Sequence, residues 1–98
     1  MEVEIIMEKS EVVFRVAKDT DTKKLASAIY SNLKNTDNLT LSCLGVPAVN
    51  QAIKAIITAR SSSISNGFDI ACYPHFSEVT ISGEEKTSIN LVLKKEVV

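Results

Sequence analysis

The sequence predicts an α/β protein of the α+β two-layer sandwich class, with two helices on one face of a four-stranded mixed sheet. The chain has 98 residues, which is the length of one domain. Hydrophobic residues make up 45% and charged residues 23%, a balance that provides a core and excludes a disordered chain. Strand-like and helix-like apolar periods follow one another in the order β-α-β-α-β-β.

The first third of the chain holds a predicted strand and a predicted helix. Residues 12–16 form a β-branched and aromatic run that stops at the polar segment 18–21, as expected of a buried strand. Asp21 or Thr22 then caps a helix, because a short side-chain oxygen accepts hydrogen bonds from the unpaired amides of a first helical turn. The buried stripe of this helix recurs every four residues, at Leu25, Ile29 and Leu33.

A second strand and a second helix follow. Turn formers fill residues 35–38, and apolar residues alternate with polar ones over 39–43 until Gly45 ends the pattern. Pro47 is tolerated in the first turn of a helix, where its missing amide hydrogen would have no partner. The second helix is therefore expected to begin near Gly45 and to run to about Arg60.

The second helix carries two stripes of side chains. We expect the apolar stripe to face the core, and it comprises Val49, Ala52, Ile53, Ile56 and Ile57. A polar stripe with three-residue and four-residue spacing comprises Asn50, Gln51, Lys54 and Thr58. Amides and an ammonium near a helix start can donate to phosphate or sugar oxygens. The polar stripe is therefore a candidate binding site, and the alternatives are a solvated face or a dimer seam.

The last third is predicted to be a loop and a long hairpin. Residues 61–67 are polar and fit a loop inside the fold. An extended stretch over 68–81 turns at residues 82–86 and returns through 87–93 with alternating polarity. Pro74 has no amide hydrogen for a ladder, so it marks an edge, a bulge or a bend in the first limb.

The charge balance limits the classes of function. Eleven basic residues against twelve acidic ones give a net charge of −1, which excludes the strongly basic whole-molecule signature of many nucleic-acid binders. Residues 18–60 nevertheless hold six bases and three acids, a local charge of +3. A dimer that set two such segments side by side would double that charge and would gain from counterion release on phosphates. The alternative is that these lysines are ordinary solvated helix residues.

Little in the sequence indicates catalysis. Cys43 and Cys72 lie in apolar segments without a basic neighbour, so we interpret them as small buried strand residues rather than nucleophiles. His75 is the single histidine, and the sequence holds no phosphate loop or nucleophile motif. We therefore expect no enzyme activity, no catalytic residues, no cofactor and no metal site. No apolar run is long enough for a bilayer and the first residues lack a secretory pattern, which favours a cytoplasmic protein without membrane contact.

Four segments of the sequence are recognisable as a family pattern. They are Gly45–Ala55 (GVPAVNQAIKA), Ala59–Arg60, Phe68–Phe76 (FDIACYPHF) and Ile81–Ile89 (ISGEEKTSI). Together they resemble the stage V sporulation protein S family, within the Alba-like superfamily. The resemblance covers about Val12 to Lys94. We therefore divide the chain into an N-terminal extension at 1–11, an Alba-like domain at 12–95 and a C-terminal tail at 96–98.

The resemblance implies an Alba-like fold with the element order given above, a homodimer or higher homo-oligomer, and nucleic-acid binding in bacterial sporulation or development. In Alba proteins a basic surface around the first loop and second helix lies on the nucleic acid, and the terminal hairpin follows the groove. The matching positions here are Lys18, Lys23, Lys24, Asn50, Lys54, Arg60 and Lys86. Glu84 and Glu85 precede Lys86 at the hairpin tip and would repel phosphate, which argues against an unchanged Alba binding mode.

Two hypotheses of function follow. The first is a small dimeric nucleic-acid-binding regulatory protein that contacts mainly the phosphate backbone of DNA or RNA. Its basic segment holds no aromatic residue except Tyr30, which the helical pattern assigns to the core, so duplexes or structured RNA suit it better than single strands. The second, favoured by the acidic pI of about 5.8, is a protein-interaction or oligomerisation module without nucleic-acid binding. The extension at 1–11 is left open as an extra strand, an interaction arm or a disordered tail.

Overall fold

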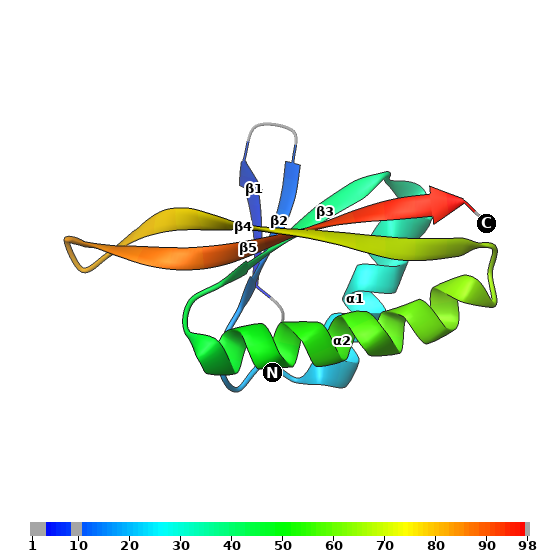
Figure 1. The fold of residues 1–98 in the computed structure, drawn as a ribbon, viewed down its shortest axis with the longest axis horizontal. Coiled ribbons are helices and arrows are strands. Elements are labelled where there is room, and N and C mark those ends of the chain that lie inside the picture. Colours follow the sequence, from blue (N-terminus) through cyan, green and yellow to red (C-terminus); the bar gives the residue numbers. More distant parts are fainter. Residues whose placement is uncertain (1–3, 9–10, 98) are drawn as a thin grey trace.

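The computed structural model describes the backbone of residues 4–8 and 11–97 and the side chains of residues 12–97. Figure 1 shows a mixed sheet with two helices packed on one side of it. The elements in chain order are β1 (Glu4–Glu8), β2 (Glu11–Val16), α1 (Thr22–Asn35), β3 (Asn38–Cys43), α2 (Val46–Ile64), β4 (Phe68–Ile81) and β5 (Glu84–Val97). The predicted β-α-β-α-β-β order is confirmed from β2 to β5.

The strand order in the sheet is β1-β2-β3-β5-β4. β2 and β3 are parallel, and the other neighbouring strands are antiparallel. Strands β2 to β5 form the predicted four-stranded mixed sheet, and β1 adds a fifth strand to it by pairing with β2. Residues 4–8 of the N-terminal extension are therefore an extra strand, while residues 1–3 and 9–10 lie outside the described residues. The predicted tail is strand at 96 and 97, and residue 98 also lies outside them.

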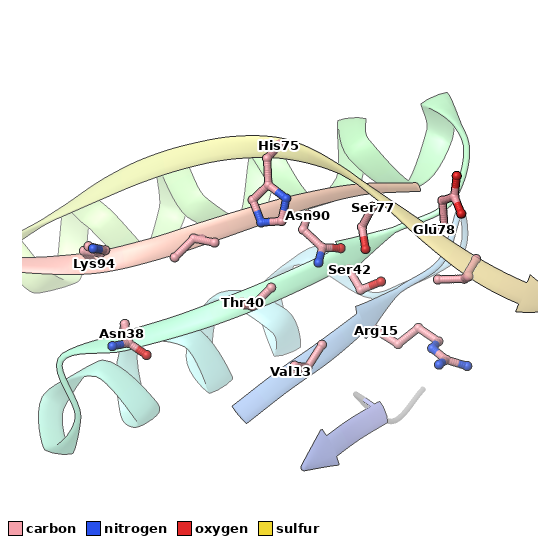
Figure 2. A pocket seen from close by; sticks show the side chains of 12 residues that line it. Val13, Arg15, Asn38, Thr40, Ser42, His75, Ser77, Glu78, Asn90 and Lys94 are labelled. Atoms are coloured by element: carbon pink, nitrogen blue, oxygen red, sulfur yellow. The ribbon is translucent and has the colours of Figure 1, made fainter. Parts of the chain in front are cut away.

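The two faces of the sheet differ in polarity. The buried residues under the helices are Phe14, Val16, Leu39, Leu41, Cys43, Phe68, Ile70, Leu91 and Leu93. The alternate positions of the same strands point away from the helices, and many of them are polar, such as Thr40, Ser42 and Asn90 (Figure 2). We call this helix-free side of the sheet the open face.

Helix α1 follows the sequence prediction closely. Oδ1 of Asp21 accepts hydrogen bonds from the backbone N–H groups of Lys23 at 2.9 Å and Lys24 at 3.1 Å, which caps the first turn. The predicted apolar stripe of Leu25, Ile29 and Leu33 is completely buried. The helix is therefore held by a polar cap at its start and by one apolar face along its length.

Helix α2 packs on the core through alanines, and one part of the predicted stripe is wrong. Its buried ridge is formed by Ala48, Ala52, Ala55 and Ala59, and we call it the alanine ridge. Ile53 is 41% exposed and Ile57 is 59% exposed, although both were expected in the core. The isoleucines and the alanines lie on different sides of the helix, and the small side chains let the helix approach its neighbours closely. The remaining predicted positions, Val49, Ala52 and Ile56, do pack against the core.

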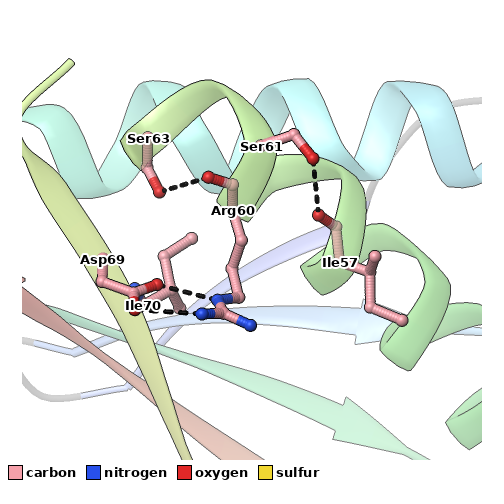
Figure 3. A network of polar contacts seen from close by, with 6 residues as sticks. All are labelled: Ile57, Arg60, Ser61, Ser63, Asp69 and Ile70. Carbon is pink, nitrogen blue, oxygen red and sulfur yellow. Dashed lines mark hydrogen bonds and ion pairs between the residues drawn. The ribbon is translucent and has the colours of Figure 1, made fainter. Parts of the chain in front are cut away.

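The end of α2 also differs from the prediction, because residues 61–64 are helical rather than loop. The serine hydroxyls of this segment donate to backbone carbonyls of the preceding turn (Figure 3). Oγ of Ser61 donates to the carbonyl of Ile57 at 3.4 Å, and Oγ of the buried Ser63 donates to the carbonyl of Arg60 at 3.1 Å. A turn at residues 65–67 follows the helix and ends at Gly67, whose φ of 93° lies in the left-handed region that favours glycine.

The β4–β5 hairpin gives the molecule its elongated shape of 43 × 26 × 20 Å. One end of the hairpin extends beyond both helices, as Figure 1 shows. Pro74 lies in β4, which is an edge strand, so the first of the three predicted alternatives for this proline is confirmed. None of the described helices has the length and apolar character that crossing a membrane requires.

Candidate nucleic-acid interface

The loop before α1 is tied to the first half of α2. Thr20 is 5% exposed, and its Oγ1 accepts a hydrogen bond from the backbone N–H of Ala17 at 2.8 Å. Nε2 of Gln51 donates to the carbonyl of Thr20 at 2.9 Å. Gln51 belongs to the polar stripe predicted from the sequence, and its position in the structure is that of a clamp between α2 and this loop.

That clamp brings five of the seven predicted site residues to one region. Lys18 lies on the clamped loop, Lys23 and Lys24 lie in the first turn of α1, and Asn50 and Lys54 flank Gln51 on α2. Lys23 also lines a groove between the two helices together with Thr58, one turn beyond Lys54. We call Lys18, Lys23, Lys24, Asn50 and Lys54 the basic surface.

The lysines of the basic surface have no ion-pair partner among the described residues. The nearest acids in sequence are Asp19 and Asp21, and the Asp21 carboxylate already accepts from the α1 backbone. The pKa of Asp21 is below its usual value, and the main cause is the hydrogen bond that its carboxylate accepts from the Lys24 backbone N–H. The four lysines of the basic surface and these two aspartates together give this region a local charge of +2 in each copy of the chain.

The start of α2 adds to this positive potential. Its N-cap is Gly45, with φ of 91°, and no side chain caps the first turn. Uncapped amides at a helix start attract anions together with the helix dipole. Lys18 and Pro47 line the same cavity of about 340 Å³, which places the lysine beside this helix start.

The structure separates Arg60 from the basic surface. Nε and Nη2 of Arg60 bond the two carboxylate oxygens of Asp69 on β4 at 2.7 and 3.0 Å, a bidentate pair drawn in Figure 3. The hydrogen bond from Arg60 lowers the pKa of Asp69, and the same bond raises the pKa of Arg60. Arg60 therefore faces β4, and a carboxylate balances its charge.

Lys86 is likewise apart from the other lysines. It lies just after the hairpin turn, where Ser82 and Gly83 both have positive φ. Its Nζ lies 3.9 Å from Oε2 of Glu84, a solvent-exposed ion pair. The acids at the hairpin tip thus reduce the attraction of this segment for phosphate.

The sequence reasoning missed a second feature of α2. Val46, Ile53, Ile57 and Ile64 are all exposed, and at 100° per residue they fall within about 40° of one another around the helix axis. We call these four residues the outer ridge. The sequence contained the evidence for it, because α2 has two apolar patterns with helical spacing, one of alanines and one of larger residues. The two patterns lie on nearly opposite sides of the helix.

The structure buries Cys43 as the sequence predicts, but it buries Cys72 only in part. Cys43 is fully buried, and burial raises the pKa of its thiol to about 11. Cys72 is half-buried, and burial raises its pKa as well. Both thiols are poor nucleophiles in these surroundings. Within the part of the chain that the structure describes, no three His, Cys, Asp or Glu side chains are grouped as a metal ion would require.

The geometry described above can be set beside known families. A family model described as Stage V sporulation protein S matches residues 12–96. The match begins in β2 and ends in β5, so it includes both helices, the basic surface and the hairpin. It leaves out β1.

Proposed function

The chain belongs to the stage V sporulation protein S family of small sporulation-related regulatory proteins, and from this premise we propose that it is a dimeric, cytoplasmic nucleic-acid-binding regulator. It contacts mainly the phosphate backbone. The observation that carries the proposal is the basic surface, whose lysines have no carboxylate partner among the described residues and lie on the first loop, the first turn of α1 and the first half of α2.

The composition of the basic surface favours phosphate contacts over base contacts. Lysine ammonium groups act as point charges toward phosphate oxygens, and each neutralised phosphate releases counterions. The Asn50 carboxamide and the amides at the start of α2 add donors that also suit phosphate or sugar oxygens. Since no aromatic residue belongs to this surface, base stacking does not contribute to binding there.

The outer ridge supports a dimer in which two α2 helices pack antiparallel. Its residues are spaced seven, four and seven apart, a pattern that reads the same in both directions along the helix. In an antiparallel pair Val46 meets the partner's Ile64. Ile53 then meets the partner's Ile57. A twofold interface requires this self-complementarity, so a second copy of the chain is the partner that the ridge fits.

This dimer would place both basic surfaces on the same side. The twofold axis of two antiparallel helices is perpendicular to the plane that contains them, so a flank of one helix and the same flank of its partner face the same way. Lys54 lies near the midpoint of the ridge and therefore near its copy. The local charge rises from +2 to +4, since each copy contributes four lysines and two aspartates. A net-acidic protein can thus present a cationic surface.

The test is a titration of labelled duplex DNA and duplex RNA at two salt concentrations. We expect salt-dependent binding by the wild-type protein, with a weaker affinity and a lower salt slope in Lys54→Glu, because each lost phosphate contact lowers the slope by about 1. Lys34→Glu is the matched control, since it makes the same charge change at the far end of α1. Equal effects of the two variants would contradict a defined basic surface.

The second candidate function is a self-assembly module that acts through protein partners. The exposed outer ridge is the observation that favours it, because a dimer is expected in both accounts. A protein that dimerises but binds neither duplex at low salt would establish this second function and would exclude the first.

A further inference from the structure

The open face of the sheet holds a polar concavity of about 430 Å³, a volume suited to a small ligand. Strand register places Arg15, Ser42, Asn90 and His75 in one row across β2, β3, β5 and β4. Figure 2 shows Asn90 between His75 and Ser42. Four adjacent strands therefore direct hydrogen-bonding side chains to one place.

Two buried polar atoms of β5 lack hydrogen-bond partners among the described residues, and of their two residues only Asn90 lines the concavity. They are Oδ1 of Asn90 and Oγ of Ser88, both on β5. Ser88 is 1% exposed, so water has little access to its hydroxyl. Unpaired buried polar atoms destabilise a protein and are rare. Because Asn90 lines the polar concavity, a ligand bound there can supply the hydrogen-bond partner that its Oδ1 lacks.

Two ring side chains of β4 lie at neighbouring positions of the ladder with β5. Tyr73 lies opposite Val92 and is 53% exposed, and His75 lies opposite Asn90. Nζ of Lys94 is 5.5 Å from the centre of the Tyr73 ring. Asn90, His75 and Lys94 line the concavity, and Tyr73 lies outside its lining, opposite the lining residue Val92 and beside Lys94.

We propose that the open face binds an unpaired nucleobase, adenine in the first place, of a nucleotide or a single strand. The base stacks on Tyr73, its amino edge pairs with the Asn90 carboxamide, and its phosphate is held by Lys94. A carboxamide can pair with adenine through two hydrogen bonds. Asn90 and Lys94 are four residues apart on one strand, a span of about 13 Å. Because the lysine side chain is flexible, its ammonium can bend back toward Asn90. One nucleotide can then reach from the Asn90 carboxamide to the Lys94 ammonium.

The contact between Lys94 and Tyr73 does not prevent stacking. A base on an aromatic ring contributes more than a cation over an exposed ring, so the exchange favours the base. The displaced ammonium remains close enough to meet the phosphate of the same nucleotide. The lysine therefore supports binding in both positions.

This inference is independent of the proposed function. The basic surface lies on the helical side of the sheet, and the open face lies on the other. Duplexes present phosphates but no free base, whereas single strands present both. The open face thus extends the range of ligands to single strands, which the sequence alone did not favour.

The test compares binding of a short labelled oligoadenylate, a short oligouridylate and AMP. Tyr73→Ala should weaken oligoadenylate binding about 5-fold to 150-fold, the range expected for loss of one stacked base. Tyr73→Phe keeps the ring and should bind within about twofold of the wild type. Asn90→Ala should remove the preference for oligoadenylate without lowering Tm, because its Oδ1 makes no hydrogen bond that holds the fold.

The arms of the experiment separate the possible outcomes. AMP binding with the same sensitivity to Tyr73→Ala identifies a free nucleotide as sufficient, and binding of the oligoadenylate alone identifies a single strand. Equal oligoadenylate affinity of wild type and Tyr73→Ala overturns the proposal, as does a lack of binding by the wild type. Lys54→Glu distinguishes the two surfaces, since it should weaken duplex binding while Tyr73→Ala leaves duplex binding unchanged.

Discussion

The two helices use their large apolar side chains in opposite ways. In α1, Leu25, Ile29 and Leu33 are completely buried, so packing within a single copy already buries the apolar face of this helix. In α2 the alanine ridge is buried, while Val46 and Ile57 are 82% and 59% exposed. Large apolar residues on a helix therefore do not by themselves identify the side that faces the core. In α2 they lie on the exposed side, which is the side that we propose a second copy buries.

The largest expected effect on stability comes from comparing a buried residue of α1 with an exposed residue of the outer ridge on α2. Leu33→Ala should lower the free energy of unfolding by about 2–5 kcal/mol, since it leaves a cavity in the core. Ile57→Ala should cost less than about 1 kcal/mol at concentrations where the chain is monomeric, because its side chain is already half in water. Urea denaturation of both variants measures the difference. Similar losses would show that the outer ridge belongs to the core of one copy.

A second prediction concerns the alanine ridge. Ala55 is fully buried, so Ala55→Leu should force α2 away from its neighbours and destabilise the protein by about 1–3 kcal/mol. Ile53→Leu conserves volume at a more exposed position and serves as the control. Thermal melting followed by circular dichroism would reveal the contrast. An Ala55→Leu variant as stable as the wild type would mean that the fold does not require the close approach of α2 to its neighbours.

The smallest effect distinguishes the two helix starts. Asp21 caps α1 and has a lowered pKa in the folded state, whereas no side chain caps α2. The contribution of its carboxylate is therefore present above the unfolded pKa of about 4 and is lost as the pH falls through the folded pKa.

Asp21→Asn retains a good cap without a titrating group. It should leave stability at neutral pH nearly unchanged and should reduce the loss below pH of about 4. Melting curves over an acid series would measure this change. An identical acid profile in the variant would count against the role assigned to Asp21.

Much of the fold follows from local sequence, and the failures have physical causes. The strands and α1 are predicted correctly because each has one apolar pattern and therefore one way to bury it. In α2 both ridges are apolar, and the close packing available to alanine decides which one is buried. Residues 61–64 continue the helix although serine is a weak helix former, so the polar composition of this segment wrongly indicated a loop.

The candidate site could be predicted only in part. The cluster of Lys18, Lys23 and Lys24 follows from their closeness in sequence. The helical spacing of the polar stripe and the resemblance to a family both indicated Asn50 and Lys54. The pair of Arg60 with Asp69 depends on where α2 ends and β4 begins. The row across the open face depends on the register of four strands, so no local pattern indicates it.

The central claim is that the outer ridge joins two basic surfaces into one site for phosphates. The double variant Ile57→Asn/Ile64→Asn alters every apolar pair of the proposed seam without changing the charge, and Thr58→Asn is a matched control. The decisive measurement is the salt slope of duplex binding by each protein, with its mass determined in solution. We predict a monomer with about half the slope of the wild-type dimer. A monomeric double variant that binds duplex with wild-type affinity and slope would contradict the account.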